Sequence, residues 1–411
     1  MRIGCIISII IALLLSSASS VFTTIAAPDK FTMIMARQDK CLKSYSQLLQ
    51  FFKKNSDSNI KYDNDYDVDF PDDYGGIYFD NQCGEVTLSL TDLDNQDIYA
   101  KYFDKALLNI KVVDYSFDEL TEVYRYLSKH ALELAISYAS ISEKNNCVNV
   151  SMMKDDTKDE LLNLLDTNNM DRNIISFEEN SCQLEFESPN IISDEPNLLE
   201  DETFYARAGE RTYVTSSTNG NFKATIGANA YDPYTHKYGI LTAGHLCEFV
   251  PNPLVFYNCN TEPINLASSA ISQVSGNCDA GFIPFYAGYN FVSSTAIING
   301  NNSSQIYNKT SIVSPAMCGS IVVSYGDTTK KQSGSIISLS TTFTADGITL
   351  EDVIQCNIAV QPGDSGGPMG IDTTNGLCLL GILTGHINTN SYFIKWGNIE
   401  QALEIEILSV Q

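Results

Sequence analysis

The chain has 411 residues, of which 44% are hydrophobic and 18% are charged, with a formal net charge of −25. That apolar fraction is ample for packed cores and excludes disorder along the whole chain. Because 50 acidic residues face only 25 basic ones, the protein would repel nucleic-acid backbones and anionic lipid surfaces, so neither nucleic acid nor a membrane is expected as a partner.

The first 27 residues have the pattern of a secretory signal peptide. Met1-Arg2 supplies a positive start, Ile6–Leu15 is an apolar run of ten residues, and Ser16–Ala27 offers the small residues at which a signal peptidase cuts. A membrane-spanning helix needs about twenty apolar residues, and no stretch of this chain reaches that length. We therefore expect a secreted, extracellular protein without a membrane anchor.

Helical and strand patterns mix before residue 188, which predicts an α+β segment. Ser116-Phe-Asp-Glu119 has the form of a capping box, and apolar residues follow it at helical spacing. A second helix is predicted over Asp159–Asp166. Runs rich in β-branched and aromatic residues predict strands at Ile77–Asp80, Val86–Leu90, Val148–Met152 and Ile174–Phe177, the first two forming a hairpin around Gly84.

The composition changes near residue 205. The residues before Ala206 carry a net charge of −19, whereas those from Ala206 onward carry −6. Ser188–Glu202 is polar and acidic and contains two prolines, as expected of an exposed linker, and Thr203–Gly209 behind it is a predicted cleavage region. Three parts follow from this division: a signal peptide (residues 1–27), an α+β segment (28–205) and a further domain (206–411).

Beyond residue 206 long helical periods disappear, and short runs of Val, Ile, Thr, Tyr and Phe alternate with Gly, Asn and Ser turns. The predicted strands include Tyr238–Thr242, Leu254–Tyr257, Ile321–Ser324, Gly334–Ser338 and Leu379–Leu383. This pattern favours an all-β barrel or sandwich. A helix is predicted only near the end of the chain, over Ile399–Ile407.

Cysteine usage agrees with secretion. Of the 11 cysteines, Cys5 leaves with the signal peptide, four precede the linker and six follow it, so each set can form disulfides within its own half. No Cys-x-x-Cys pair occurs, and we expect neither a metal nor a cofactor. Glycan acceptor sequences begin at Asn149, Asn301, Asn302 and Asn308.

Three segments of the late half hold residues suited to nucleophilic catalysis. Leu241-Thr-Ala-Gly-His245 ends in histidine, Asn277-Cys-Asp279 ends in an acid, and Gly363-Asp-Ser365-Gly-Gly-Pro holds a serine. A serine hydroxyl is a weak nucleophile until a base takes its proton. We predict Ser365 as the nucleophile, His245 as its base and Asp279 as the carboxylate that orients the imidazole.

Glycines around Ser365 allow a tight turn in which the N–H groups of Gly363 and Ser365 converge on a developing oxyanion. Taken singly, each motif has an ordinary structural explanation: a buried histidine, a capping aspartate or a solvent-facing turn. Their combination in this order within one β-rich domain favours catalysis. If Asp279 is not the acid, Asp232 and Asp327 are the next candidates.

These motifs resemble those of the chymotrypsin-like serine peptidases, particularly the streptogrisin and α-lytic protease branch. Val323–Ile336 looks like that branch's Gly/Thr-rich hairpin, whereas Tyr74–Thr91 and Val112–Leu120 look like parts of the α-lytic-type pro-region. The resemblance implies an all-β double β-barrel (trypsin-like) catalytic domain, preceded by an α+β pro-region over residues 28–205. It further implies that the pro-region assists folding and then inhibits.

The cysteines depart from that branch. Leu246 follows the histidine where the branch has cysteine, and further family cysteines are replaced at Val323, Ser333 and Ala359. The six late cysteines must therefore pair differently, and Cys247 with Cys259 is the simplest pairing.

The surroundings of the acid beside the serine also differ. Ser324 stands where the branch has a basic partner for Asp364, and no arginine follows Arg211. A lysine such as Lys330 is a candidate for that partner.

The resemblance also places the specificity pocket. Its base is expected at Ala359 and Val360, and because no aspartate stands there, a preference for Arg or Lys is disfavoured. Its wall is expected at Thr384, Gly385 and His386. His386 either narrows the pocket, favours an acidic substrate side chain or points to solvent.

Together the motifs predict a secreted serine endopeptidase that hydrolyses peptide bonds through an acyl-enzyme and is made as a precursor. The expected partners are protein or peptide substrates and the chain's own pro-region, and a monomer is expected. Two alternatives stay open: a protease-fold binding protein without turnover, and a latent complex from which the pro-region never leaves.

Overall fold

The computed structural model describes residues 29–55, 68–154, 157–178, 203–216, 220–248, 254–259, 262–267, 270–285, 290–299, 303–309, 316–345, 347–373 and 376–408. The chain divides into a short unit, Met1–Met33, and a long unit, Ile34–Gln411. In the short unit, Asp29 Oδ1 accepts the Thr32 N–H at 2.7 Å in the first turn of helix α2 (Lys30–Asn55). The predicted signal peptide and the predicted linker lie outside the described residues.

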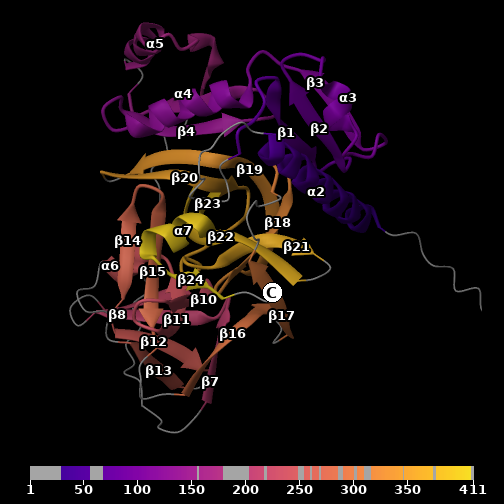
Figure 1. Cartoon of the computed structure of the whole chain (residues 1–411). Helices are drawn as coiled ribbons and strands as arrows, with labels where there is room; N and C mark the ends of the chain where they lie inside the picture. Colours follow the sequence, from indigo (N-terminus) through magenta and orange to yellow (C-terminus); the bar gives the residue numbers. More distant parts are fainter. Residues whose placement is uncertain are drawn as a thin grey trace, which may run out of the picture. The chain divides into compact units, whose positions relative to one another are not determined.

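Within the long unit, residues 68–178 contain the predicted mixture of helices and strands (Figure 1). β1 (Tyr74–Asp80) and β2 (Glu85–Leu90) pair as an antiparallel hairpin, and β3 (Leu108–Val112) lies parallel to β2. The helices are α3 (Gln96–Ala100), α4 (Phe117–Lys129), α5 (Lys158–Thr167) and the 3₁₀ turn η2 (Arg172–Ile174). The predicted hairpin and both predicted helices are confirmed.

The start of α4 confirms the predicted capping box. Ser116 Oγ accepts the Glu119 N–H at 3.2 Å, and the Glu119 carboxylate accepts the Ser116 N–H at 2.7 Å. These bonds satisfy donors that a helix N-terminus otherwise leaves unpaired.

A 12-stranded sheet combines strands from distant parts of the chain. Its main path runs β6-β5-β4-β19-β18-β21-β22-β17-β16-β7, with β20 and β23 paired off that path. The early members are β4 (Ile136–Ser142), β5 (Cys147–Met152), β6 (Ile175–Phe177) and β7 (Thr203–Ala208). The later members are β16 (Asn290–Asn299), β17 (Ser303–Lys309), β18 (Ile321–Gly326), β19 (Lys330–Ala345), β20 (Ile348–Cys356), β21 (Pro368–Thr373), β22 (Gly376–Ile387) and β23 (Asn390–Lys395).

The junction between β4 and β19 is antiparallel. Ala139 on β4 lies opposite Thr342 on β19, and Tyr138 lies opposite Phe343. Helix α2 adds a second junction, because the amide of Gln38 exchanges hydrogen bonds with the Ile321 backbone: its Nε2 donates to Ile321 O at 3.0 Å, and its Oε1 accepts the Ile321 N–H at 2.6 Å. Gln38 thereby bonds the first residue of β18 much as a neighbouring strand would.

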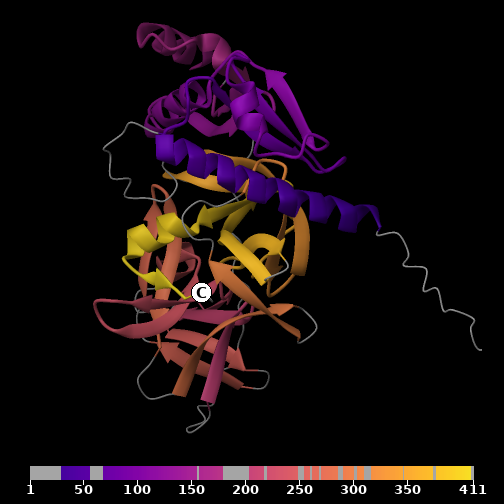
Figure 2. The ribbon, with the colours of Figure 1, turned by 45° about the vertical axis from the view of Figure 1, so that its right-hand side comes forward.

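Two smaller sheets complete the late half. One runs β14-β15-β11-β10-β24 and the other β13-β12-β8-β9. Their strands are β8 (Arg211–Ser216), β9 (Gly220–Thr225), β10 (Ala228–Asp232), β11 (Lys237–Thr242), β12 (Leu254–Cys259), β13 (Glu262–Ala267), β14 (Ile271–Ser275), β15 (Cys278–Pro284) and β24 (Glu406–Ile407). The described helices of this half are α6 (Gly244–Glu248) and α7 (Trp396–Leu403), so residues 203–408 are mostly β-structure, as predicted (Figure 2).

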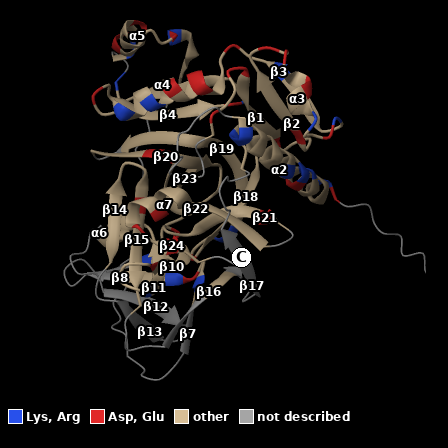
Figure 3. Cartoon of the chain, in the orientation of Figure 1, with Lys and Arg blue, Asp and Glu red and all other residues tan. Residues whose placement is uncertain are grey.

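Charge follows the division seen in the composition. Figure 3 shows Asp, Glu, Lys and Arg concentrated on the elements of residues 29–178, whereas strands β18–β23 carry few. Among the residues that the structure describes, no helix has the length and apolarity needed to cross a membrane.

The boundary predicted at residues 205 and 206 falls within β7. This strand runs parallel to β16, and Ala206 and Ala208 are fully buried. All but the last residue of the predicted cleavage region, Thr203–Gly209, is therefore folded into a sheet.

Candidate active site

Adjacent strands bring His245 and Asp279 together. β11 ends at Thr242, helix α6 follows it directly, and β11 pairs with β15, which holds Asp279. His245 Nδ1 lies 2.8 Å from Asp279 Oδ2, and the His245 backbone N–H donates to Asp279 Oδ1 at 2.7 Å. Both side chains are buried, at 2% and 0% exposure. One carboxylate thus holds both the ring and the backbone of His245, and with the proton on Nδ1 the other ring nitrogen, Nε2, is an acceptor.

Thr384 on β22 contacts the same carboxylate. Its hydroxyl donates to Asp279 Oδ2, and the residue is fully buried. The sequence places Thr384 in the expected pocket wall but gives no sign of this bond, because the partners lie 105 residues apart. Asp279 therefore receives three hydrogen bonds, from the His245 ring, the His245 backbone and Thr384.

Ser365 lies in a loop between β20 and β21, the serine loop (Gln361–Gly367). The Thr225 N–H donates to Ser365 O at 2.9 Å, and the Gly366 N–H donates to Leu383 O at 2.8 Å. Gly363 adopts a φ of +98°, a conformation that favours glycine. Ser365 is 1% exposed, and its Oγ has no hydrogen-bond partner among the described residues.

The serine loop packs against the segment that precedes His245. A Cβ added to Gly366 would lie 2.3 Å from Thr242 Oγ1 and 2.8 Å from Ala243 N. On the other side, Leu383 bonds Gly366 and is followed by Thr384, which bonds Asp279. The structure thereby gathers the three predicted motifs around the ends of β11 and β22.

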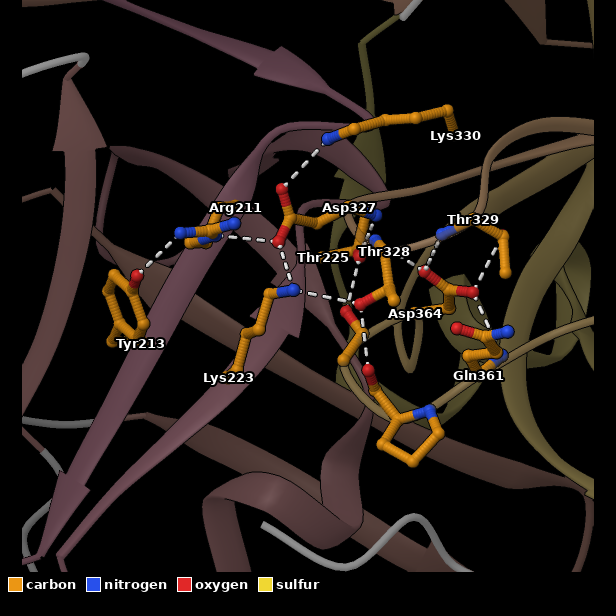
Figure 4. Close-up of polar contacts among 12 residues, drawn as sticks. Arg211, Tyr213, Lys223, Thr225, Asp327, Thr328, Thr329, Lys330, Gln361 and Asp364 are labelled. Carbon is orange, nitrogen blue, oxygen red and sulfur yellow. Dashed lines mark hydrogen bonds and ion pairs between the residues drawn. The ribbon is translucent and has the colours of Figure 1, made fainter. Parts of the chain in front are cut away.

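The carboxylate of Asp364 is held by uncharged donors. Oδ1 accepts the N–H groups of Thr328 at 2.7 Å and Thr329 at 3.1 Å, whereas Oδ2 accepts the Thr329 hydroxyl at 2.7 Å and the Gln361 N–H at 3.0 Å (Figure 4). The suggestion that Lys330 pairs with Asp364 is wrong. Lys330 Nζ instead lies 3.2 Å from Asp327, because the turn between β18 and β19 directs backbone donors, and not the lysine, toward Asp364.

The predicted pocket residues differ in exposure. Ala359 is exposed, and Gly385 lies opposite Tyr392 on β23. His386 lies opposite Ser391 and is half-buried, with its Nδ1 inaccessible to solvent. The hydroxyl of Thr384 already serves Asp279, so only the backbone of this residue is left for a substrate.

Asp232 and Asp327, the two alternative candidates for the acid that orients His245, have other partners. Asp232 accepts hydrogen bonds from the Tyr234 N–H at 2.8 Å and the Thr235 hydroxyl at 2.5 Å. Asp327 pairs with three cationic side chains, from Arg211, Lys223 and Lys330. Of the three candidate acids, Asp279 is the one bonded to His245 in the described contacts.

The disulfides predicted for most of the described cysteines are not formed. Free thiols are found at Cys41, Cys83, Cys147, Cys278, Cys318, Cys356 and Cys378. The side chain of Cys259 lies outside the described residues, so its pairing with Cys247 stays a prediction. Beside Asp279, burial and then the charge of that aspartate raise the pKa of Cys278 to about 12. Within the described ranges, no three His, Cys, Asp or Glu side chains group as metal ligands.

Comparison with known proteins gives likenesses of structure alone. No family model matches the chain. No curated protein matches it in sequence. Similar solved structures include a chymotrypsin from Cellulomonas bogoriensis at 20% identity, protease A from Thermobifida fusca at 18% and the Nocardiopsis protease at 18%. Each match covers 50% of this chain and 100% of the other, with a TM-score of 0.38.

Proposed function

We propose that this chain is the precursor of a secreted serine endopeptidase, with residues 206–411 forming a trypsin-like double β-barrel catalytic domain. The observation that carries the proposal is the environment of Asp279. One buried carboxylate binds the ring and the backbone of His245, next to a loop that presents Ser365. A carboxylate that orients an imidazole beside a serine is the arrangement that acyl transfer requires.

In the proposed reaction, Ser365 Oγ attacks the carbonyl carbon of a peptide bond while His245 Nε2 takes the hydroxyl proton. The N–H groups of Gly363 and Ser365 stabilise the oxyanion of the tetrahedral intermediate. His245 then protonates the departing amine as the C–N bond breaks, which leaves an acyl ester on Ser365. Water, deprotonated by the same imidazole, hydrolyses that ester and restores the serine.

The Ser365 hydroxyl has no hydrogen-bond partner among the described residues. Catalytic hydrogen bonds are often long or misaligned before substrate binds and tighten in the complex. We expect the Ser365 Oγ to His245 Nε2 bond to form when a peptide occupies the site. The carboxyl group of Asp279 changes little in this step, because its three bonds are already made.

Residues 28–205 are proposed as a pro-region that assists folding and then inhibits. The pairing of β4 with β19 and the bonds of Gln38 to Ile321 support a template role, because they hold β18 and β19 in register. The same contacts favour the alternative of a latent complex that persists after cleavage. Because β7 pairs with β16, we place the maturation cut before Thr203, so that residues 203–205 stay with the catalytic domain and not, as the composition predicts, with the pro-region.

The specificity pocket is proposed to involve Ala359, Gly385 and His386. His386 is half-buried, and its three predicted roles stay open: it narrows the pocket, favours an acidic substrate side chain or points to solvent. No carboxylate stands at Ala359 or Val360, which disfavours Arg and Lys as the recognised side chain. Peptides and proteins are the proposed substrates.

A fluorophosphonate probe, which reacts with activated serines, tests the proposal. The secreted protein should be labelled at Ser365 alone, and Ser365→Ala should lose both labelling and peptide cleavage by several orders of magnitude while keeping its fold. Asp279→Asn should lower kcat by about four orders, because the imidazole then holds the wrong tautomer. Peptide cleavage by Ser365→Ala at the parental rate would overturn the assignment, and persistent failure of the parent to label after proteolytic trimming would favour the binding-protein alternative.

A further inference from the structure

Three cationic side chains surround one buried carboxylate next to the serine loop. Arg211 Nε lies 2.6 Å and Lys223 Nζ 2.7 Å from Asp327 Oδ2, and Lys330 Nζ lies 3.2 Å from Oδ1 (Figure 4). Asp327 is 6% exposed, whereas the cations are 35%, 13% and 53% exposed in that order. The cations come from β8, β9 and the start of β19, so Asp327 ties the β8–β9 sheet to the turn between β18 and β19.

That turn holds the serine loop by several bonds. The N–H groups of Thr328 and Thr329 bind the Asp364 carboxylate, and the Thr328 hydroxyl donates to Pro362 O at 2.7 Å. Close packing reinforces them, since a Cβ added to Gly326 would lie 2.2 Å from Asp364 Oδ1. The turn therefore determines where Pro362 and Asp364, on either side of Gly363, are placed.

Asp327 and the serine loop also share two intermediaries. Lys223 Nζ donates to the Thr328 hydroxyl at 2.8 Å as well as to Asp327. The Thr225 hydroxyl accepts the Asp327 N–H at 2.9 Å and donates to Gly363 O at 2.8 Å. The Thr225 hydroxyl thus bonds Gly363, which belongs to the proposed oxyanion site, and Lys223 bonds the Thr328 hydroxyl that holds the neighbouring Pro362.

The charges explain why a carboxylate suits this position. Burial alone would raise the pKa of Asp327, but hydrogen bonds from Lys223 and Arg211 and their charges outweigh it and lower the pKa. Without this anion, three cations would face one another beside Gly363. The Asp327 carboxylate binds Arg211 of β8 and Lys223 of β9, and so joins that sheet to the turn that carries the donors for Asp364.

We propose that Asp327 is a positioning residue of the protease, holding Gly363 and Ser365 in the conformation that binds the oxyanion. The proposal rests on the proposed function and goes beyond it, because Asp327 touches neither the nucleophile nor the base in the described contacts. Its carboxylate acts through Lys223 and Thr328, whereas its backbone N–H bonds Thr225. The oxyanion donors are useful only when they are aligned before reaction, and a displacement of about 1 Å costs about a hundredfold in rate.

The test compares Asp327→Asn with Asp372→Asn in the full secreted chain after maturation. Asp372, on β21, pairs with Lys331 of β19 at 2.7 Å at intermediate exposure, so it controls for loss of an ion pair. We expect Asp327→Asn to lower kcat by about a hundredfold with KM within about threefold. Binding of a peptide boronate, whose adduct uses the oxyanion site, should weaken in parallel with kcat/KM, and Asp327→Glu should restore part of both.

Variants of the three cationic residues make the test independent of whether Asp327→Asn folds. Lys223→Met should lower kcat most, Arg211→Gln less and Lys330→Met least, in the order of their burial. If Asp327→Asn does not fold, this series and the boronate affinities decide. A kcat within twofold of the parent for Asp327→Asn, or equal losses in the Asp372→Asn control, would overturn the positioning role while the labelled parent leaves the proposed function standing. A parent that neither labels nor cleaves would instead overturn the proposed function.

Discussion

Thr384 supplies a hydroxyl to the carboxylate that orients His245. Hydrogen bonds to charged groups are worth about 1.5–3 kcal/mol when one partner is removed, and the buried carboxylate has no water to replace this donor. We expect Thr384→Val to lower kcat/KM by about tenfold to a hundredfold, with KM little changed, because the orientation of the imidazole is lost and not substrate affinity. Thr384→Ser keeps the hydroxyl and should stay near the parental rate.

Steady-state kinetics on one peptide substrate measure this difference. If Val and Ser at this position behave alike, the Thr384 hydroxyl has no part in catalysis. A rise in KM alone would point to the pocket wall that the sequence predicts.

At the scale of elements, helix α4 bonds strand β19 beside the β4–β19 junction. Thr342 on β19 bonds the hydroxyls of Tyr124 at 2.9 Å and Ser128 at 2.6 Å, and is fully buried. Thr342→Val leaves buried hydroxyls with fewer partners, which costs about 1–3 kcal/mol. We expect the two segments to dissociate about tenfold to a hundredfold more readily once the chain between them is cut.

Thr349→Val is the matched control for Thr342→Val. Its hydroxyl, on β20, bonds Thr344 of β19 at 3.0 Å, with no described hydrogen bond to residues 29–178. The dissociation constant of the nicked protein, measured by titration, should change for Thr342→Val and not for the control. Equal effects would mean that the substitutions weaken the sheet itself.

The sequence predicted elements whose signals are local. The capping box at Ser116 and the hairpin around Gly84 depend on neighbouring residues, and both were found. The sequence analysis predicts no helix over α2, whose otherwise apolar buried face is interrupted by Gln38. The polar Gln38 is explained only by Ile321, 283 residues away.

The last predicted helix was right in kind and wrong in length. α7 ends at Leu403, because Glu404 adopts a left-handed φ of 54° and Ile407 pairs with Ala230 on β10. That pairing is a tertiary contact, which helical periodicity does not reveal.

In the candidate site, too, local motifs are predictable from the sequence and long-range contacts are not. The histidine, aspartate and serine motifs are short, and their residue types indicate nucleophilic catalysis. Thr328 and Thr329 lie 36 and 35 residues from Asp364, and Arg211 lies 116 residues from Asp327, so no local pattern predicts these contacts. The sequence therefore indicated the reacting groups but not the contacts that hold them.

At the scale of the whole molecule, one buried carboxyl should make stability depend on pH. Glu143, after β4, accepts the Ile77 N–H at 2.8 Å and the Cys318 thiol at 3.2 Å. Burial raises its pKa from 4.5 to about 7, although both bonds lower it. The nearby Tyr45, Tyr74 and Cys318 have raised pKa values and stay uncharged.

The sign follows from the two states of Glu143. Below the pKa of Glu143 in the unfolded chain, the carboxyl is protonated in the folded and unfolded states alike and does not change stability. Above that pKa the unfolded chain ionises first, so the free energy of unfolding falls until the pH passes the folded pKa of about 7. We expect a loss of about 3 kcal/mol between pH 4 and pH 8 from this group. Urea unfolding of the parent and Glu143→Gln at both pH values measures it, and an equal pH dependence in the two proteins would contradict the assignment.

The thiol that faces Glu143 has a practical consequence. Cys318 is 4% exposed, its carbonyl accepts the Phe79 N–H at 2.8 Å, and burial raises its pKa well above the usual range. Alkylating reagents attack thiolates, so they should spare Cys318 for as long as residues 77–143 cover it. In the proposed maturation those residues leave, and the same atom becomes open to carboxymethylation. The mass of a single tryptic peptide would then time the departure of the early segment, with no need for a substrate or an antibody.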